Sequence, residues 1–486
     1  MTLSPTLTRR LKAPKLFETI AAGAGGGGTF PVVNPATGEV LAALPDMGAA
    51  EAAVAIERAQ AAQAGWAGLT ARARSDLLWR WHRLILAHAD DLAAILTAEM
   101  GKPLAEAASE VAHAAAYVQW YAEEANRVYG ETIAPPSTDR RMLVIKQPVG
   151  VVGTITPWNF PASMVARKIS PALAAGCAVV LKPAEQTPLV AGAMVALAAE
   201  AGFPEGVVNI VYAAEGDAVG RELCSNPHVR KISFTGSTEV GRLLMRQCAD
   251  QIKKVSLELG GNAPFIVFDD ADVDAAVDGA IQAKFRNAGQ TCVSANRLYV
   301  QAGVHAEFTE KFAARVKTLP VGDGFTPGVA IGPLIDVRAL EKIEAHVADA
   351  VAKGGTVLTG GRRISGTGTF YEPTVLTGIS GAMRVAREET FGPLAPILRF
   401  EDPAEVVREA NDTIYGLAAY FYASNLSRVW RVAEALEYGM VGINTGRMSS
   451  EAAPFGGVKQ SGIGREGSRH GLEEYLEMKY LCMGGI

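Results

Sequence analysis

The sequence has few cysteines and histidines, and neither type is arranged for metal or disulfide chemistry. Its five cysteines, an odd number without a Cys-x-x-Cys pair, are Cys177, Cys224, Cys248, Cys292 and Cys482. Its seven histidines form no cluster with ligand spacing. This pattern argues against a disulfide framework and against a metal site. Unpaired cysteines are typical of a reducing compartment, so we expect a cytoplasmic protein.

Two further absences limit the possible partners. The chain has no excess of positive charge, since its formal net charge is −5, and we therefore expect no nucleic-acid partner. No apolar run reaches the length needed to cross a membrane, because the run over 169–181 stops at Lys182. We therefore expect no membrane partner either.

What the chain does have is length. At 486 residues it exceeds the size at which one hydrophobic core keeps growing, so we expect two or three domains. The basic start of the chain resembles a transit peptide, but we predict a flexible N-terminal tail over residues 1–28. The reason is the Gly/Ala run over 22–28, which loses too much backbone entropy on ordering to hold structure unaided.

The hydrophobic pattern divides the rest of the chain into regions of different predicted secondary structure. Residues 30–45 predict two short strands about a turn at Ala36-Thr37-Gly38, and residues 49–128 predict an almost wholly helical region. From residue 140 onward, β-branched runs alternate with Ala-rich helical segments, and a second such series includes strands near 264–268 and 394–400. This alternation is typical of parallel α/β sheets, so the fold class is α/β.

Two strand ends are candidates for a nucleotide-binding crevice. "KISFTGSTEVGRLLM" predicts a strand, a turn at Gly236-Ser237 and a helix, and a helix N-terminus can bind pyrophosphate. The turn departs from GxGxxG spacing and is weak evidence alone. "VVLKPAEQTP" ends a second strand with Lys182 and Glu185, where an acid could accept hydrogen bonds from ribose hydroxyls or simply cap a helix.

Cys292 lies in "KFRNAGQTCVSANR", among polar and flexible residues that do not suit a packed strand. A free cysteine is more often a small buried hydrophobe, as the contexts of Cys177 and Cys248 indicate for those two residues. A nucleophilic Cys292 would need its thiolate, and hence a base or an electropositive setting. Both interpretations stay open on this stretch alone.

Two other motifs carry groups that a nucleophilic cysteine could use. "LELGGNAP" places Glu258 before a Gly-Gly turn, where it could activate water or form a salt bridge. "TPWNFP" places Asn159 where its amide could donate to a developing oxyanion or serve as a turn residue before a helix near Pro161.

Taken together, these motifs resemble the aldehyde dehydrogenase superfamily over nearly the whole chain. The motifs that carry the resemblance are "NPATGEV", "PWNFP", "LKPAEQTP", "FTGSTEVG", "LELGGNAP", "NAGQTC", "EETFGP", "PFGGVKQSG" and "GREG". The resemblance implies a Rossmann-like NAD(P)-binding domain over 29–129 and 149–257, and an α/β catalytic domain over 258–460. It also implies a small β oligomerisation element over 130–148 and 461–486, and with it a homodimer or homotetramer.

The resemblance also implies roles for individual residues. Cys292 would be the nucleophile, Glu258 the general base for deacylation, and Asn159 with the Cys292 backbone N–H the oxyanion hole. The residues implied to bind the cofactor are Trp158, Lys182, Glu185, Gly236, Ser237, Glu389 and Phe391. No metal is implied.

Within the superfamily the chain is most similar to succinate-semialdehyde dehydrogenases. The residues that carry this likeness are Arg167, Arg286 and Ser449, which would bind the far carboxylate of a four-carbon semialdehyde. A guanidinium suits this role because its planar fork pairs a carboxylate bidentately. The plain alternative for Arg286 is an arginine on a helix surface, and for Arg297 no function is implied.

Three positions depart from the pattern of these relatives. Ser294 stands where some have a second cysteine, which excludes a redox-switch disulfide with Cys292. Arg447 stands where an apolar residue is more usual, and would either add a cation to the substrate tunnel or pair with an acid outside it. Glu185 stands where NADP-dependent relatives often have a small residue, so we expect NAD as the preferred cofactor, with NADP possible.

The predicted function is NAD(P)-dependent oxidation of succinate semialdehyde to succinate. The small-molecule substrate would form a thiohemiacetal on Cys292, lose a hydride to the cofactor and leave as a hydrolysed thioester. The alternative within this class is a dehydrogenase for glutarate semialdehyde, 2-oxoglutarate semialdehyde or another ω-carboxylated aldehyde. Outside the class, the alternatives are a cofactor-free thiol esterase and a protein that retains only the fold.

Overall fold

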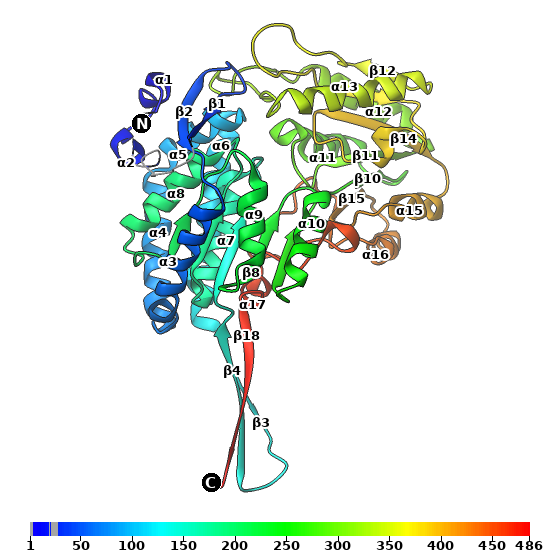
Figure 1. Ribbon diagram of the computed structural model, residues 1–486. Helices are drawn as coiled ribbons and strands as arrows, with labels where there is room; N and C mark the ends of the chain where they lie inside the picture. Colours follow the sequence, from blue (N-terminus) through cyan, green and yellow to red (C-terminus); the bar gives the residue numbers. More distant parts are fainter. Residues whose placement is uncertain (1–2, 19, 21–27) are drawn as a thin grey trace.

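The computed structural model describes residues 3–18, 20 and 28–486, and its first large unit is a six-stranded sheet (Figure 1). The strand order is β17-β9-β8-β5-β6-β7, and all neighbours are parallel except β17 and β9. The bounds are β5 Val151–Ile155, β6 Val179–Lys182, β7 Val208–Ile210, β8 Val229–Thr235, β9 Lys254–Glu258 and β17 Gly462–Ile463.

Alternating side chains give this sheet two buried faces, because successive residues of a strand point to opposite sides. In β6, Val179 and Leu181 join the larger hydrophobic cluster, whereas Val180 joins a second one. The second cluster is covered by α3 Ala49–Ala67, α9 Gly216–Ser225 and α10 Thr238–Ala249. The larger cluster is covered by α4 Ala71–Ala87, α5 Ala89–Met100, α6 Leu104–Glu124, α7 Pro161–Ala175 and α8 Pro188–Glu200.

The second large unit is a seven-stranded sheet in the order β12-β13-β14-β11-β10-β15-β16. Its neighbours are parallel except β12 and β13. The bounds are β10 Ala263–Val267, β11 Ala295–Gln301, β12 Thr356–Thr359, β13 Thr374–Thr377, β14 Leu394–Phe400, β15 Ala418–Tyr422 and β16 Met440–Ile443.

Helices also cover both faces of this sheet, and β10 again shows the alternation. Phe265 and Val267 face one cluster and Ile266 faces the other. The first face carries α11 Val273–Phe285, α12 Ala302–Lys317 and α13 Val337–Ala352, and the second carries α15 Pro403–Asn411 and α16 Leu426–Ala435. Two parallel sheets with helices on both faces confirm the predicted α/β class.

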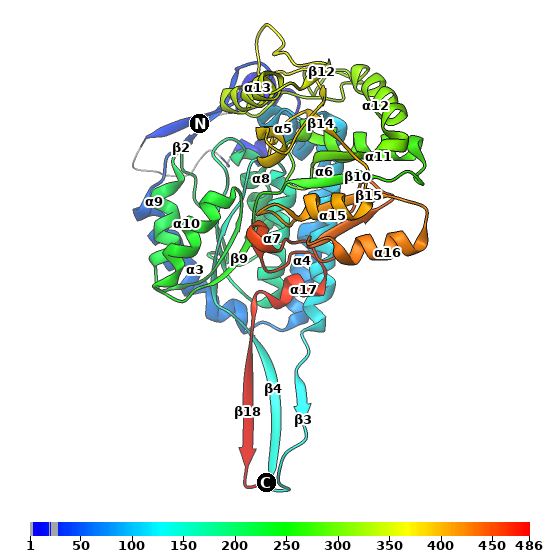
Figure 2. The ribbon, with the colours of Figure 1, turned by 90° about the vertical axis from the view of Figure 1, so that its right-hand side faces the viewer.

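A narrow arm of three antiparallel strands projects from this body (Figures 1 and 2). It consists of β3 Glu131–Ile133, β4 Arg140–Pro148 and β18 Leu476–Gly484. The predicted oligomerisation element contains all three strands. That predicted element also includes β17, which pairs with β9, and α17 Ser468–Glu473, which packs on α7.

The prediction of a flexible tail is wrong for residues 3–18 and 20. This segment forms α1 Pro5–Thr8 and α2 Pro14–Glu18, and the side chains of Leu7 and Phe17 are fully buried against the larger cluster. The backbone N–H groups of Lys12 and Ala13 donate to the carboxylate of Asp91 on α5, at 2.7 and 3.0 Å. Most of the Gly/Ala run lies outside the described residues.

The remaining elements are short, and they complete the connections between the sheets. Their bounds are β1 Thr29–Val33, β2 Val40–Pro45, α14 Arg384–Arg387, and the 3-10 turns η2 Ala125–Arg127, η3 Arg286–Gly289 and η4 Lys459–Ser461. β1 and β2 pair antiparallel, as predicted for residues 30–45. Within the described residues no helix is both long and apolar enough to span a bilayer.

Candidate active site

The residues predicted for catalysis come from three different parts of the fold and meet between the two sheets. Cys292 lies in the turn before β11, Asn159 in the loop between β5 and α7, and Glu258 at the carboxyl end of β9. Cys292 and Asn159 line one cavity of about 340 Å³. Asn159 and Glu258 lie at the carboxyl ends of β5 and β9, where ligands bind in α/β sheets, whereas Cys292 comes from the turn before β11 of the other sheet.

The turn that carries Cys292 is conformationally strained. Asn287, Ala288 and Gly289 are all left-handed, with φ of 53°, 54° and 73°. A side chain at Gly289 would put its Cβ only 2.2 Å from the carbonyl oxygen of Gly392. Non-glycine residues with positive φ cost about 1 to 3 kcal/mol each and persist only where the surroundings hold them. The turn is therefore held in place by its neighbours rather than by its own preferences.

The thiol of Cys292 is half-buried beneath the cavity. Burial raises its pKa to about 12; the nearby Arg167 and Arg286 lower the pKa, whereas Glu389 and Glu258 raise it. The thiol is consequently protonated near neutral pH, and a base must accept its proton before it can attack a carbonyl carbon.

The carboxamide of Asn159 is fixed beside Cys292. The backbone carbonyl of Asn159 accepts hydrogen bonds from Lys102 Nζ at 2.7 Å and Asn287 Nδ2 at 2.9 Å. Its own Nδ2 donates to the carbonyl of Gln290 at 3.1 Å. One of the two N–H bonds of Nδ2 is used in this way, so the other can donate to an oxygen bound in the cavity.

Glu258 has the properties of a strong base. It is 3 % exposed, and neither of its carboxylate oxygens has a hydrogen-bond partner among the described residues. Burial raises its pKa well above the usual value, and the neighbouring Glu466 raises it further. A carboxylate with unused acceptor sites near a cysteine is suited to take a proton from water.

A buried charge cluster that no sequence motif indicated lies near Glu258. Glu466 forms an ion pair with Arg167 at 2.8 Å and accepts a hydrogen bond from Lys168 Nζ at 2.5 Å. Burial raises the pKa of Glu466, but Lys168 and Arg167 lower it more, so Glu466 stays ionised. Glu466 belongs to "GREG", the last motif of the resemblance. Nothing in the residues around it predicts a contact with helix α7.

Arg286 and Ser449 lie together, as predicted, and Arg447 joins them. All three line a small second cavity, which also touches Tyr420. Arg286 stacks over the ring of Phe160 at 5.2 Å but forms no ion pair or side-chain hydrogen bond with any described residue. Its guanidinium is therefore available to an anion.

Arg167 does not line this cavity. Its guanidinium pairs with Glu466 and packs over the ring of Phe455 at 4.0 Å, while its Nε has no hydrogen-bond partner. Arg167 acts on Cys292 mainly through its charge, which lowers the thiol pKa. Of the two arginines predicted to share a carboxylate, Arg286 lines the small cavity, whereas Arg167 is paired with Glu466.

A third cavity of about 350 Å³ extends the first one along the six-stranded sheet. Lys182, Glu185, Gly236 and Ser237 line it, and Gly236, Ser237 and Trp158 line both cavities. Ser237 caps α10 by accepting a hydrogen bond from Val240 N. A cation, a helix N-terminus and an elongated groove fit a dinucleotide, with its pyrophosphate near α10.

The other end of this groove lies beside Cys292. Glu389 Oε1 accepts a hydrogen bond from Gly261 N at 2.8 Å, and burial raises the Glu389 pKa to about 7. Phe391 has a positive φ of 58° and meets the Trp158 ring edge-on, with ring centroids 5.4 Å apart. These three predicted cofactor-binding side chains therefore all reach the cavity that contains Cys292.

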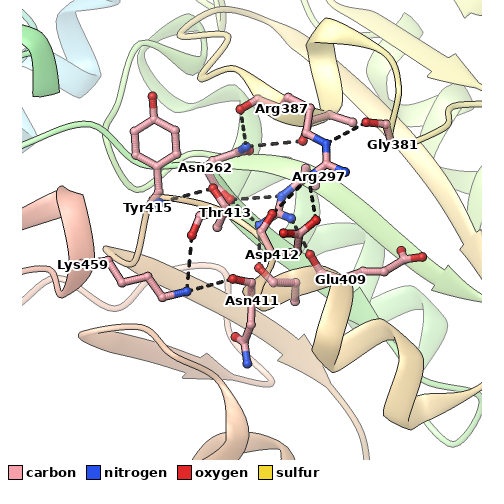
Figure 3. A network of polar contacts seen from close by, with 12 residues as sticks. Asn262, Arg297, Gly381, Arg387, Glu409, Asn411, Asp412, Thr413, Tyr415 and Lys459 are labelled. Carbon is pink, nitrogen blue, oxygen red and sulfur yellow. Dashed lines mark hydrogen bonds and ion pairs between the residues drawn. The ribbon is translucent and has the colours of Figure 1, made fainter.

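Arg297, for which the sequence suggested no function, has a structural role (Figure 3). It is 2 % exposed and its guanidinium is hydrogen-bonded on every side. Its acceptors are the carbonyls of Asn262, Glu409 and Ala410 and the hydroxyls of Tyr299 and Tyr438. Arg297 therefore ties β11 to the segments around α15 and β16.

Comparison with known proteins identifies several close relatives. The chain is 78% identical to a probable succinate-semialdehyde dehydrogenase [NADP(+)] of Sinorhizobium fredii, covering 100% of both chains. It is 59% identical to the succinate-semialdehyde dehydrogenase [NADP(+)] of Escherichia coli, covering 95% of both. It is 57% identical to a glutarate-semialdehyde dehydrogenase of Pseudomonas aeruginosa, covering 98% of this chain and 100% of that protein.

These names contradict the expectation that NAD is the preferred cofactor. The relatives from S. fredii and E. coli are both named for NADP. The expectation rested on Glu185, an acid that stands where NADP-dependent relatives often have a small residue. In the structure, that carboxylate forms an ion pair with Lys182 Nζ at 3.2 Å, so its charge is compensated and a cation lies beside it.

The fold and the family agree with the resemblance drawn from the motifs. The crystal structure of succinate-semialdehyde dehydrogenase from Burkholderia pseudomallei matches with a TM-score of 0.94 at 59% identity, covering 95% of this chain and 96% of that one. The family model described as aldehyde dehydrogenase family matches residues 22–481. This chain therefore belongs to the aldehyde dehydrogenase family.

Proposed function

We propose that this aldehyde dehydrogenase oxidises succinate semialdehyde to succinate and uses NADP in preference to NAD. The observation that carries the proposal is that Cys292 lies where two different cavities approach each other. One is the elongated groove suited to a dinucleotide, and the other is the small cavity lined by Arg286 and Ser449. A substrate with an aldehyde at one end and an anion at the other matches this arrangement.

The first half of the reaction takes place on Cys292. Its thiol transfers a proton to a base, and the sulfur attacks the aldehyde carbon to give a tetrahedral thiohemiacetal. The free N–H of Asn159 Nδ2 and the backbone N–H of Cys292 would donate to the oxyanion, and removing one such donor typically costs about 3 kcal/mol. The bound dinucleotide supplies the hydride acceptor, and loss of the hydride leaves a thioester on Cys292.

The second half of the reaction depends on Glu258. Its carboxylate takes a proton from a water molecule, the resulting hydroxide attacks the thioester carbon, and the C–S bond breaks to release the acid. The raised pKa of Glu258 makes it a better base once it is ionised. Its two oxygens have unused acceptor sites for that water.

The remote carboxylate would be bound by Arg286 and Ser449, with Arg447 as an additional cation. Arg286 and Arg447 line the same small cavity, and neither has an ion-pair partner among the described residues. This supports the first of the two roles considered for Arg447. Arg167 remains a predicted substrate-binding residue, and its ion pair with Glu466 engages only its Nη2.

The cofactor would be held along the groove by the residues predicted for it. Lys182 and Glu185 would contact the adenosine ribose, with Lys182 facing the 2′-phosphate, and Gly236 and Ser237 would lie by the pyrophosphate. Glu389, Phe391 and Trp158 would hold the nicotinamide end beside Cys292.

A second candidate substrate is glutarate semialdehyde. A relative of that name is 57% identical to this chain. The arginine cavity recognises a carboxylate and says little about the number of carbons between it and the aldehyde. The distinction rests on the distance from Cys292 to Arg286, which a flexible arginine can adjust.

Steady-state kinetics on four-carbon, five-carbon and 2-oxo-substituted semialdehydes, each with NADP and with NAD, test the proposal. We expect the largest kcat/KM for succinate semialdehyde with NADP. A kcat/KM tenfold higher for the five-carbon substrate would replace it by the second candidate. Turnover without any dinucleotide would instead support a thiol esterase.

We further propose that the protein is a cytoplasmic homodimer or homotetramer. All five cysteines are free, which suits a reducing compartment. The arm of β3, β4 and β18 leaves its outer strands without partners in the protomer and exposes Met478 and Tyr480. Unpaired strand edges and apolar side chains of this kind favour pairing with a second copy. Light scattering coupled to size-exclusion chromatography measures the oligomer.

A further inference from the structure

The loop that carries Glu389 and Phe391 is held on both sides of Glu389. Glu388 and Thr390 flank it in sequence and make contacts with β11 and α13, and Thr390 also lines the cavity that contains Cys292. Thr390 is 1 % exposed. Because the predicted cofactor contact lies between two anchored residues, its position depends on these anchors.

One anchor is His346, a fully buried residue on α13. Its Nε2 lies 3.0 Å from Glu388 Oε2 and its Nδ1 lies 3.2 Å from Thr390 Oγ1. Glu388 also receives two hydrogen bonds from Arg384, and its pKa is lowered to about 2, so it is a carboxylate that only accepts. His346 must therefore donate from Nε2–H and accept the Thr390 hydroxyl at Nδ1.

The other anchor is Asn296 on β11. Its Oδ1 accepts from Thr390 N at 3.0 Å, and its Nδ2 donates to the carbonyl of Glu388 at 2.9 Å and to Asn262 Oδ1 at 2.7 Å. The backbone carbonyl of Asn262 in turn accepts a hydrogen bond from Arg297. The loop is thus bonded to the central sheet through Asn296 and to α13 through His346.

Helix α13 is itself a wall of the cofactor groove. Asp336, Arg338, Ala339 and Lys342, at the N-terminal end of this helix, line the cavity that contains Cys292. His346 lies one turn beyond Lys342 on the same helix. The hydrogen bonds of His346 therefore connect α13, which lines the groove, to the loop that carries Glu389.

We propose that His346 is a positioning residue for the cofactor. It holds the Glu389 loop at a set distance from α13, so that Glu389 and Phe391 meet the nicotinamide end of the dinucleotide in the geometry needed for hydride transfer. The inference rests on the proposed function, since it assigns His346 to the binding of NADP.

A graded series of substitutions tests this role. The amide of Gln reaches about as far as His Nε2, so His346→Gln keeps the donor to Glu388. Asn reaches only as far as Nδ1, so His346→Asn keeps the acceptor for Thr390. His346→Leu removes both. We measure the Kd for NADP by calorimetry without substrate, and kcat and KM with it.

For His346→Leu we expect the Kd for NADP to rise about tenfold and kcat to fall about tenfold, with the KM for the aldehyde little changed. We expect His346→Gln to restore most of the NADP affinity. Thr390→Val, which removes a single hydrogen bond, should raise the Kd about threefold. An NADP affinity and kcat in His346→Leu equal to those of the unmodified protein would overturn the inference.

His82 on α4 offers a matched control. It is a buried histidine with one hydrogen bond, from its ring to the carbonyl of Ala115 at 2.8 Å, and it lines neither part of the cofactor groove. We expect His82→Leu to lower the melting temperature without changing the Kd for NADP. An equal rise in Kd there would show general loosening and overturn the inference. An unmodified protein that neither binds NADP nor oxidises semialdehydes would overturn the proposed function as well.

Discussion

Two arginines flank Cys292 in the sequence, and the structure gives them opposite surroundings. Arg297 is buried and donates to five residues, so that nothing of its guanidinium is left for a ligand (Figure 3). Arg286 is half-buried beside a cavity and has no side-chain hydrogen bond or ion pair within the described part of the chain. The two residues are alike in chemistry and in distance from the cysteine.

The difference separates a structural from a functional arginine. Buried polar groups are nearly always hydrogen-bonded, because an unpaired one costs about 1 to 3 kcal/mol. Exceptions occur in several parts of the described chain, and those near Cys292 include the carboxylate of Glu258 and the side-chain carbonyl of Asn159. Such groups are tolerated where substrate or water completes their hydrogen bonding, and this pattern distinguishes the site from the network around Arg297.

The largest expected effect comes from substituting the catalytic residues Cys292 and Glu258. Cys292→Ala should lower oxidation at least 1,000-fold, because no other group can form the thioester. Glu258→Gln should still release a burst of NADPH in a single turnover, since it blocks only hydrolysis of the thioester. Stopped-flow absorbance at 340 nm measures both.

Cys177 is the matched control for this prediction. It is fully buried, and burial raises its pKa to about 11, but it lines none of the three cavities described here. Cys177→Ala should keep full activity. Steady-state turnover by Cys292→Ala, or the lack of any burst in Glu258→Gln, would contradict the assigned roles.

Arg286→Met should lower kcat/KM for succinate semialdehyde about 100-fold and leave the melting temperature unchanged. A charge-assisted contact with a carboxylate is worth about 3 kcal/mol when desolvated, and each 1.4 kcal/mol is a factor of ten. An uncharged aldehyde of the same length should be oxidised equally well by both proteins. A matching loss on that substrate would mean that Arg286 supports the fold instead.

Arg297→Met should give the opposite result. It leaves several buried carbonyl and hydroxyl groups without their donor, which costs about 1 to 3 kcal/mol for each fully buried group. We expect the melting temperature to fall by about 5 °C or more, while kcat/KM of the folded fraction stays within about threefold. Calorimetry and kinetics on the same sample decide this. A large loss of kcat/KM at an unchanged melting temperature would show that Arg297, like Arg286, acts in the reaction and not in the fold.

Much of the site could be predicted because its groups lie in short motifs at strand ends. Asn159 follows β5 and Glu258 ends β9, and the carboxyl ends of one parallel sheet lie at the same edge. Cys292 precedes β11 of the other sheet, so its position beside them depends on how the two sheets pack. The pairing of Arg167 with Glu466 could not be predicted, because it joins α7 to the far end of the chain. Only the packing of α7 against that segment brings the two charges within reach.

The two wrong predictions have similar causes. The N-terminal segment looked flexible because its own sequence cannot hold a structure, but Phe17 is buried by helices that come later in the chain. Glu185 looked like a bar to NADP because its charge was considered alone, whereas Lys182 compensates it. In both cases a local property was outweighed by a neighbour that the pattern did not reveal.

Glu466→Gln should shift the acid limb of the pH profile of kcat to lower pH. The negative charge of Glu466 raises the pKa of Glu258. Its removal ends that repulsion and frees Arg167 and Lys168 to stabilise the Glu258 carboxylate. Glu258 is therefore ionised at lower pH. A shift toward higher pH would contradict this coupling, and a thermal melt checks that the buried cations left behind do not unfold the protein.

The smallest expected effect belongs to Arg447, which extends the contrast between the arginines. Arg447 is exposed, and its side chain, like that of Arg286, has no partner within the described residues. It lies in a more hydrated setting, where a charge contributes less. Arg447→Ile should lower kcat/KM for succinate semialdehyde about fivefold, and less at high salt, whereas Arg447→Lys should keep most of the rate. Kinetics at low and high ionic strength measure both. An equal loss with the uncharged aldehyde would show that Arg447 shapes the entrance without binding the anion. An arginine without a side-chain partner would then indicate a binding role only where it is also partly buried, as Arg286 is.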